Sequence, residues 1–553
     1  MPDPFPTIKR ELQRYRSEDG NPAIQLFGRR FFSDQTVPEL LIEFLLLANS
    51  QKRIGEIIID KGHVFPDIDV LKNWPPETLL AYAPKSRLNL KLFALIGASK
   101  LETRHKSHRD HYRELLQCIQ ERITVSGSAD KEEILKTLEN LFLGFQRVGE
   151  QRTWCAQSFL PIHPEMLASE TLWNSTKAKK AEDWDEVTER FNHFFTSNQH
   201  RFLARGGELL YLQLCNLLRQ SPDIIRTWCK DVNAGLDERE MTPPLLAEAL
   251  SDGLNKAVNS CPSTVGALAK FIDTGAEPET AKRTDYQDGE PRYVKCGWCP
   301  AETWPESLLF AVELLRLCDA IIDPVERIYL LETSCAMQVL RSLCAQSARY
   351  TDHGDIIKQD SGALNYVWAF SDPEGRSDTI KRISRRSVSA IQRMIQKAIR
   401  HPDILKNIEE QKKREGIRWK DPYKEADKRY GHKLFLTLAK RLGMIVPRRG
   451  AGARFILTDH LLRYLVLTII RPGERMTYDT FKKQVFQRHG MAFDDEYLRG
   501  ACRWCGTRPL TTLGDDIDKW LTDMLRSAGM LVQLSDSCSM VKNPFTAERE
   551  NHQ

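Results

Sequence analysis

KRISRRSVSAIQRMIQKAIR, residues 381–400, lies in the basic region 376–454, around which this chain is organised. Its basic side chains recur at steps of three, four or seven residues, and its apolar side chains occupy another side. Because residues three and four apart share one face of a helix, the pattern predicts an α-helix with a basic and an apolar face. The basic set is Arg382, Arg386, Arg393, Lys397 and Arg400, and the apolar set is Ile383, Ile391, Ile395, Ala398 and Ile399.

The positive charge of the chain is concentrated around this stretch. Residues 376–454 contain 23 Lys and Arg against 8 Asp and Glu, whereas all 553 residues together carry a net charge of only +5. Each Lys or Arg that neutralises a phosphate releases a condensed counterion, so a surplus of this density favours nucleic acid as a partner. A solvated face that serves only solubility is the alternative.

A second helix and a hairpin follow the basic stretch. The pattern over residues 432–442 predicts a helix that ends at Gly443, since a glycine in the left-handed conformation commonly ends a helix. Two β-prone runs, 444–446 and 454–457, predict a hairpin, and its turn carries Arg448 and Arg449 among proline and glycine residues.

A helix, a glycine stop and a hairpin with a basic tip resemble the second half of a winged-helix domain. In that family the helix before the hairpin enters the major groove, and the hairpin contacts the DNA backbone or the minor groove. The resemblance implies a nucleic-acid interface in the first of two such units. Its candidate residues are Arg382, Arg386, Arg393, Lys397, Arg400, Lys433, Lys440, Arg441, Arg448, Arg449 and Arg454.

The C-terminal part repeats the pattern with different charge. Residues 461–470 predict a buried central helix, and a helix over 520–528 precedes a second hairpin over 529–542. Acidic residues in and before this helix and at the turn would repel phosphate, so we expect packing or protein contact here. They are Asp515, Asp516, Asp518, Asp523 and Asp536.

The rest of the chain has mostly helical periodicity. Thr36 and Glu39 have capping-box spacing around Pro38, which predicts a helix start, whereas residues 24–32 suggest a short extended pair around Gly28. Few stretches have the alternation of a strand. Helices are expected over 88–96, 112–123, 132–145, 203–218, 245–258, 308–322 and 328–343.

Two polar stretches rich in glycine and proline, 274–306 and 351–375, indicate boundaries. We therefore expect a mainly α, multidomain fold, with a helical body and tandem winged-helix-like units at the C-terminus. The acidic stretch 351–375 either shields the basic region or is a solvated linker. The predicted domains are 1–275, a helical N-terminal body; 276–375, a helical middle segment with flanking linkers; 376–458, the basic helix and first unit; and 459–553, the second unit.

A cytoplasmic location without a membrane partner is expected. The run from Leu40 to Ala48 is interrupted by Glu43 and is far shorter than the ~20 apolar residues of a membrane span. The first residues lack the pattern of a signal peptide. Thirteen cysteines scattered over a large chain fit reduced core residues better than a disulfide framework.

Two C-x-x-C pairs, Cys296 with Cys299 and Cys502 with Cys505, are the metal candidates. Four such thiolates suit tetrahedral zinc, but about 200 residues separate the pairs, far beyond the spacing of a compact zinc module. We therefore expect no metal and two unrelated thiol pairs. His105, His108 and His111 share one helix face, yet their arginine and lysine neighbours favour a solvated basic face over a metal site.

The common signatures of enzymes are absent from the sequence. It contains no G-x-x-x-x-G-K-[ST], no G-x-S-x-G and no H-E-x-x-H, so neither a cofactor nor a reaction is expected. A metal-dependent nuclease stays an alternative, because its carboxylates need not be close in sequence. A protein-interaction scaffold whose basic region binds an acidic partner is another.

The opening RRFFSDQTVPELL, residues 29–41, leads into a large helical body without enzyme motifs. This layout resembles accessory proteins of bacterial anti-phage defence islands, such as companion subunits of Druantia-type systems. The resemblance implies a cytoplasmic, non-enzymatic subunit that binds or scaffolds DNA beside a separate helicase or nuclease.

Overall fold

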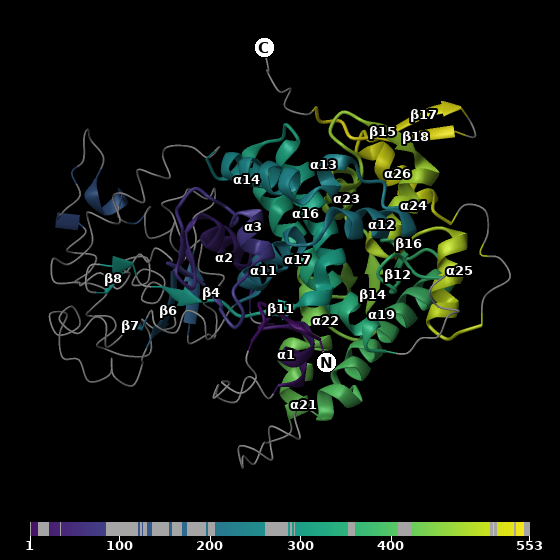
Figure 1. Cartoon of the computed structure of the whole chain (residues 1–553). Helices are drawn as coiled ribbons and strands as arrows, with labels where there is room; N and C mark the ends of the chain where they lie inside the picture. Colours follow the sequence, from purple (N-terminus) through teal and green to yellow (C-terminus); the bar gives the residue numbers. More distant parts are fainter. Residues whose placement is uncertain are drawn as a thin grey trace.

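The computed structural model describes most of the N-terminal and C-terminal parts of the chain (Figure 1). Its described residues are mainly helical, which confirms the predicted fold class at that level. The described ranges are 2–8, 21–33, 35–83, 205–259, 293–351, 360–406, 422–508, 517–535 and 538–546, together with short pieces between 120 and 291 and Leu513.

Two helices, α16 (Trp304–Asp319) and α17 (Pro324–Arg349), lie at the centre of the fold (Figure 1). Every residue of α16 from Pro305 to Cys318 is buried, as expected for a helix surrounded by others. Four of the helices predicted from periodicity are confirmed here, and the three over 88–96, 112–123 and 132–145 lie largely outside the described residues. The confirmed helices are α11 (Gly206–Leu218), α14 (Pro243–Asn259), α16 and α17.

Other helices pack around this centre. The helix α2 (Val37–Asn49) contacts α11 and α17, and α19 (Asp378–Ile399) contacts α17. The α23 helix (Asp459–Ile469) contacts α16, and its burial confirms the predicted central helix. The remaining helices include α3 (Ile68–Lys72), α12 (Pro222–Asp231), α13 (Glu238–Met241), η4 (Ala301–Thr303), α21 (Pro422–Glu425), η5 (Ala426–Tyr430), α22 (His432–Arg441), α24 (Tyr478–His489), α25 (Asp495–Trp504) and α26 (Lys519–Ser527).

The start of the chain corrects one prediction and bears out another. The extended pair expected around Gly28 is wrong, because residues before it form α1 (Pro22–Phe27), with the Asn21 side chain accepting the N–H of Ala23. Proline in the first turn and an N-cap asparagine favour a helix here despite the β-prone residues. In α2, the Glu39 carboxylate accepts the N–H of Thr36 at 2.6 Å, as the capping-box spacing predicts.

The structure contains several small sheets, and most of their strands were not predicted from the sequence. The strands are mostly two to five residues long, too short to show alternation. In the N-terminal sheet, β10 (Val294–Lys295), β4 (Leu80–Ala83), β2 (Gln51–Ile54) and β3 (Ile57–Ile59) are neighbours in that order. Shorter pairings join β1 (Pro4–Phe5) with β11 (Cys299–Pro300), β5 (Trp154–Gln157) with β6 (Ser169–Trp173) and β7 (Phe195–Thr196), and β8 (Tyr286–Gln287) with β9 (Glu290–Pro291).

Two further sheets belong to the C-terminal half. The first runs in the order β13 (Ile445–Val446), β14 (Arg454–Ile456), β12 (Trp368–Ser371) and β16 (Met491–Ala492), with β12 parallel to both of its neighbours. The second runs in the order β15 (Arg475–Thr477), β18 (Cys538–Lys542) and β17 (Leu531–Ser535), and it is antiparallel. Both hairpins predicted from the sequence are therefore present.

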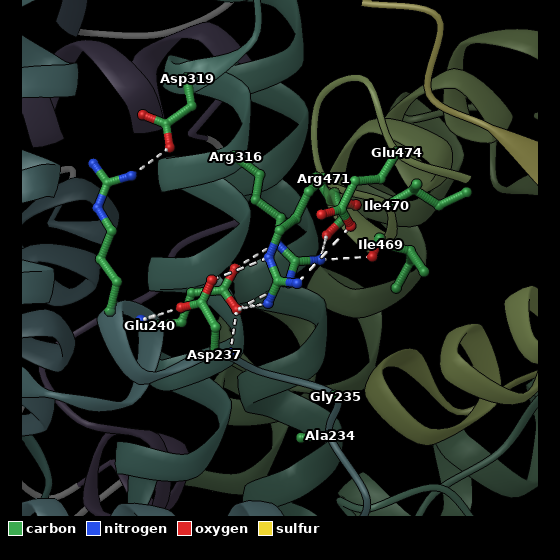
Figure 2. Close-up of polar contacts among 12 residues, drawn as sticks. Ala234, Gly235, Asp237, Glu240, Arg316, Asp319, Ile469, Ile470, Arg471 and Glu474 are labelled. Atoms are coloured by element: carbon green, nitrogen blue, oxygen red, sulfur yellow. Dashed lines mark hydrogen bonds and ion pairs between the residues drawn. The ribbon is translucent and has the colours of Figure 1, made fainter. Parts of the chain in front are cut away.

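A buried polar network joins the C-terminal sheet region to the central helices (Figure 2). Glu240 of α13 accepts two hydrogen bonds from Arg316 of α16, at 2.6 and 3.0 Å, and a third from Arg471 at 3.0 Å. The Arg316 guanidinium also donates to the carbonyls of Thr468 and Ile469 at the end of α23. Helix-end carbonyls have no partner within the helix and attract cations, so this arginine satisfies them.

This network joins residues of three predicted domains, 1–275, 276–375 and 459–553. The remaining domain, 376–458, contacts α17 through α19 and α22. The boundaries themselves stay a prediction.

Candidate nucleic-acid interface

The α19 helix carries most residues of the site, and two of its buried serines bind it to the sheet that contains β12 and β14. The Ser387 hydroxyl donates to the carbonyl of Val367 at 2.9 Å and accepts the N–H of Ala369 at 3.1 Å. Ser384 accepts the N–H of Phe455 at 2.8 Å. Because β12 and β14 are both held by this helix, its orientation relative to the hairpin is fixed.

The opposite face of α19 is exposed and basic, as the periodicity predicted. Between Arg382 and the helix end, the exposed positions are five cations and Ser389, and the capping residue Arg400 is exposed too. At about 100° and about 1.5 Å per residue, five of these side chains lie within an arc of about 60° and along about 27 Å. We call them the α19 row: Arg382, Arg386, Arg393, Lys397 and Arg400.

Arg385 is an exposed cation that the sequence prediction left out. It lies about 60° from Arg382, on the opposite side from the rest of the row. Its spacing of three residues from Arg382 is a signal that places it on the same broad face. The basic face is thus wider than predicted.

Most of this face has no acidic counterpart among the described residues. Within the described ranges, only Arg400 of the row forms an ion pair, with Asp427 at 2.7 Å, and its guanidinium lies over the Tyr423 ring. The remaining members and Arg385 form no ion pair with a described residue.

The acidic stretch before α19 does not cover the row with its described residues. Asp360 pairs with Arg503 of α25, and one of these contacts measures 2.6 Å. Asp372 accepts the N–H of Glu374 and of Arg376, both at 2.9 Å, so it closes a turn. The described residues of the stretch 351–375 therefore favour a linker over a segment that shields the basic region.

The β13–β14 hairpin places a second basic element beside α19. Ile445 pairs with Phe455 and Val446 with Arg454, and Gly443 has a φ of 74°, so the predicted helix stop and hairpin are confirmed. Between the strands, residues 447–453 form what we call the hairpin tip, and Pro447 to Gly452 are exposed. A Cβ atom built at Gly452 would lie 3.5 Å from Nε of Arg385, which puts the tip against the α19 face.

Two predicted interface residues have their side chains engaged by the protein itself. Arg454 donates to the Ser371 hydroxyl at 2.6 Å and to the carbonyls of Asp372 and Pro373, both at 2.9 Å. Arg441 donates to the carbonyl of Gln35 at 2.8 Å and to that of Ser33. We therefore assign these two arginines a structural role within the site.

The other predicted positions lie on α22 and at the tip. Lys433 is exposed near the start of α22, and Lys440 is half-buried in its last turn. Arg448 and Arg449 are exposed at the tip. The structure thus brings the row, Arg385 and the tip together, and α22 packs against α19 beside them.

The two C-x-x-C pairs lie in different surroundings. Cys299 belongs to β11, which pairs with β1, and the N–H of Cys296 donates to the carbonyl of Leu80. Cys502 and Cys505 lie at the end of α25, which packs against α19. Burial raises the pKa of the Cys505 thiol to about 12, although Arg393 and Arg386 oppose the change. The Cys505 thiol is therefore protonated at neutral pH.

In the part of the chain that the structure describes, no group of three or more His, Cys, Asp or Glu side chains is placed to hold a metal ion. His105, His108 and His111 lie outside the described residues, as do Asp515, Asp516 and Asp536.

No family model, curated protein or solved structure matches the chain. Among the described helices, none has the length and apolar character needed to cross a bilayer.

Proposed function

We propose that this chain is a non-enzymatic subunit that binds duplex DNA through the α19 row and the hairpin tip, and that it scaffolds a larger complex. The observation that carries the proposal is a rigidly mounted row of exposed cations, of which only Arg400 has an acidic partner among the described residues, beside a basic tip. Side chains of this kind bind phosphate by charge-assisted hydrogen bonds and release counterions.

The connectivity of the C-terminal unit supports a winged-helix-like origin. The order α23, β15, α24, α26, β17 and β18, with β18 between β15 and β17, is a helix-rich unit closed by a three-stranded sheet and a hairpin. β16 and α25 are inserted before α26. In the first unit the hairpin follows α19 and α22, but β14 also pairs with the parallel strand β12. We propose that this first hairpin is a wing built into a larger sheet.

The charge of the second unit supports a different task for it. Asp518 accepts hydrogen bonds from Lys482 at 2.8 Å and from Tyr478 at 3.0 Å, and Asp523 pairs with Arg526 at 2.9 Å. Leu534 on the second hairpin is 59% exposed. A balanced surface with an exposed leucine suits packing or a protein partner more than phosphate.

The defence-island part of the proposal rests on the resemblance of residues 29–41. This stretch links two regions, because the N–H of Arg29 donates to the carbonyl of Trp298 and that of Ser33 to the carbonyl of Arg429. It therefore connects the N-terminal body to the element that precedes α22. We propose that a cytoplasmic helicase or nuclease docks on the body while α19 holds DNA.

The first test is charge reversal within the row. Changing Arg386, Arg393 and Lys397 together to Glu should weaken binding to a duplex of ~30 base pairs by at least about 100-fold at low salt, measured by fluorescence anisotropy. The matched control reverses Lys61, Lys72 and Lys483, which are exposed lysines outside the site. Parent-like affinity of the row variant, or an equal loss in the control, would reject the proposal and favour a scaffold that binds an acidic protein.

A further inference from the structure

We infer that the α19 row and the hairpin tip hold the two strands of one duplex, the row on one phosphate backbone and the tip on the other. This inference rests on the proposed function. It gives the two basic elements separate partners within that double helix.

The first support is the way the two elements are arranged. Viewed along the helix axis, the side chains of the row lie between the direction of Arg382 and a direction about 60° from it. Arg385 lies about 60° from Arg382 in the opposite direction. A Cβ atom built at Gly452 of the tip would lie 3.5 Å from Nε of Arg385, so this part of the tip lies beside that second edge. Arg385, at the edge beside the tip, and the rest of the row therefore lie on different sides of Arg382.

The spacing that results suits the grooves of DNA. A helix with its side chains is about 10–12 Å across, and the grooves of B-DNA are about 6 and about 12 Å wide. Cations on the two edges of one helix face are thus separated by a distance comparable to a groove. One phosphate backbone alone would leave one of the two edges without a partner.

The tip is narrow and firmly mounted. Between Arg449 and Arg454 its residues are only glycine and alanine, and a Cβ atom built at Gly450 would meet nothing within 4 Å. Below it, Arg454 ties β14 to the turn after β12, and Ser384 ties the same strand to α19. A thin tip on a fixed base can reach a second strand without rearrangement of the sheet.

The chemistry of the exposed side chains also favours a duplex. Proteins that hold single strands combine cations with aromatic rings on which bases stack. The row and the tip contain only Arg, Lys, Pro, Gly and Ala side chains. They offer contacts to phosphates and contain no aromatic ring on which an unpaired base could stack.

The test compares double-stranded and single-stranded DNA of the same sequence, using the full chain. For the double variant Arg448→Ala, Arg449→Ala, we expect duplex affinity to fall about tenfold and the slope of log K against log salt to become less steep by about 1.8. Single-strand affinity should stay within about twofold of the parent. The variant Arg386→Ala, Arg393→Ala should weaken both ligands.

The matched control is Lys61→Ala, Lys72→Ala, which removes the same charge from exposed positions outside the site. Circular dichroism checks that each variant is folded. An equal loss of single-strand and duplex affinity in the tip variant, or no loss on the duplex, would overturn the two-strand assignment while leaving the proposed function intact. A parent protein that binds neither DNA would overturn both.

Discussion

The α19 row and the arginines around Glu240 use the same side chain in opposite ways. Arg316 is 3% exposed, and its N–H groups reach a buried carboxylate and two helix-end carbonyls. Arg386 and Arg393 are exposed and form no ion pair with a described residue. A buried guanidinium is stable only when paired, whereas an exposed one keeps its charge for an external anion. Arginine content alone does not separate these roles, but burial and partners do.

The largest expected effect comes from breaking the buried cluster. Glu240→Ala leaves Arg316 buried beside Arg471 without its carboxylate, so the free energy of unfolding should fall by about 3–5 kcal/mol, measured by urea denaturation. Arg393→Ala in the row should change it by less than about 0.5 kcal/mol. Similar losses in the two variants would contradict the contrast between the regions.

A smaller effect should appear as a pH dependence of stability to which Glu240 of the buried cluster contributes and the cations of the row do not. Burial opposes the ionisation of Glu240, but Arg316, the N–H of Asp237 and Arg471 outweigh it and lower the pKa of this carboxyl to about 2. Its ordinary value is 4.5, so its contribution to stability is complete above about pH 4.5 and is lost as the pH falls toward about 2.

Glu240→Gln should therefore flatten the decrease of stability in this acidic range, followed by thermal denaturation at a series of pH values. Glu326→Gln is the matched control, because Glu326 pairs with Arg463 at a half-exposed position. If both variants keep the parent's acid profile, the cluster does not depend on the charge of Glu240.

Local patterns were sufficient to predict α19, α22 and both hairpins. In each case the deciding signal lies within the element: steps of three and four for α19, and a glycine stop followed by a short β-prone run for the hairpin. Arg385 follows the same steps and was within reach of this reasoning. The mainly helical class follows from the same periodicity.

Long-range contacts explain what local patterns could not provide. The strand β12, Trp-Ala-Phe-Ser, is buried on both faces, so it has no alternation of polar and apolar residues. Arg441 and Arg449 each follow another basic residue. Only the structure shows that Arg441 donates to the carbonyl of Gln35, 406 residues away in sequence. The partner that turns a basic surface residue into a structural one is not visible in its own segment.

The central claim is that the α19 row lies on phosphates, and the salt dependence of duplex binding by the full chain tests it most directly. Four to seven contacts from the row, Arg385 and the tip, at about −0.9 each, predict a slope of log K against log salt between about −4 and −6. A measured slope in that range, reduced by about 2.7 when Arg386, Arg393 and Lys397 are changed to Ala, is the expected result. A parent slope shallower than about −2, or one that these changes leave unaltered, would contradict the account.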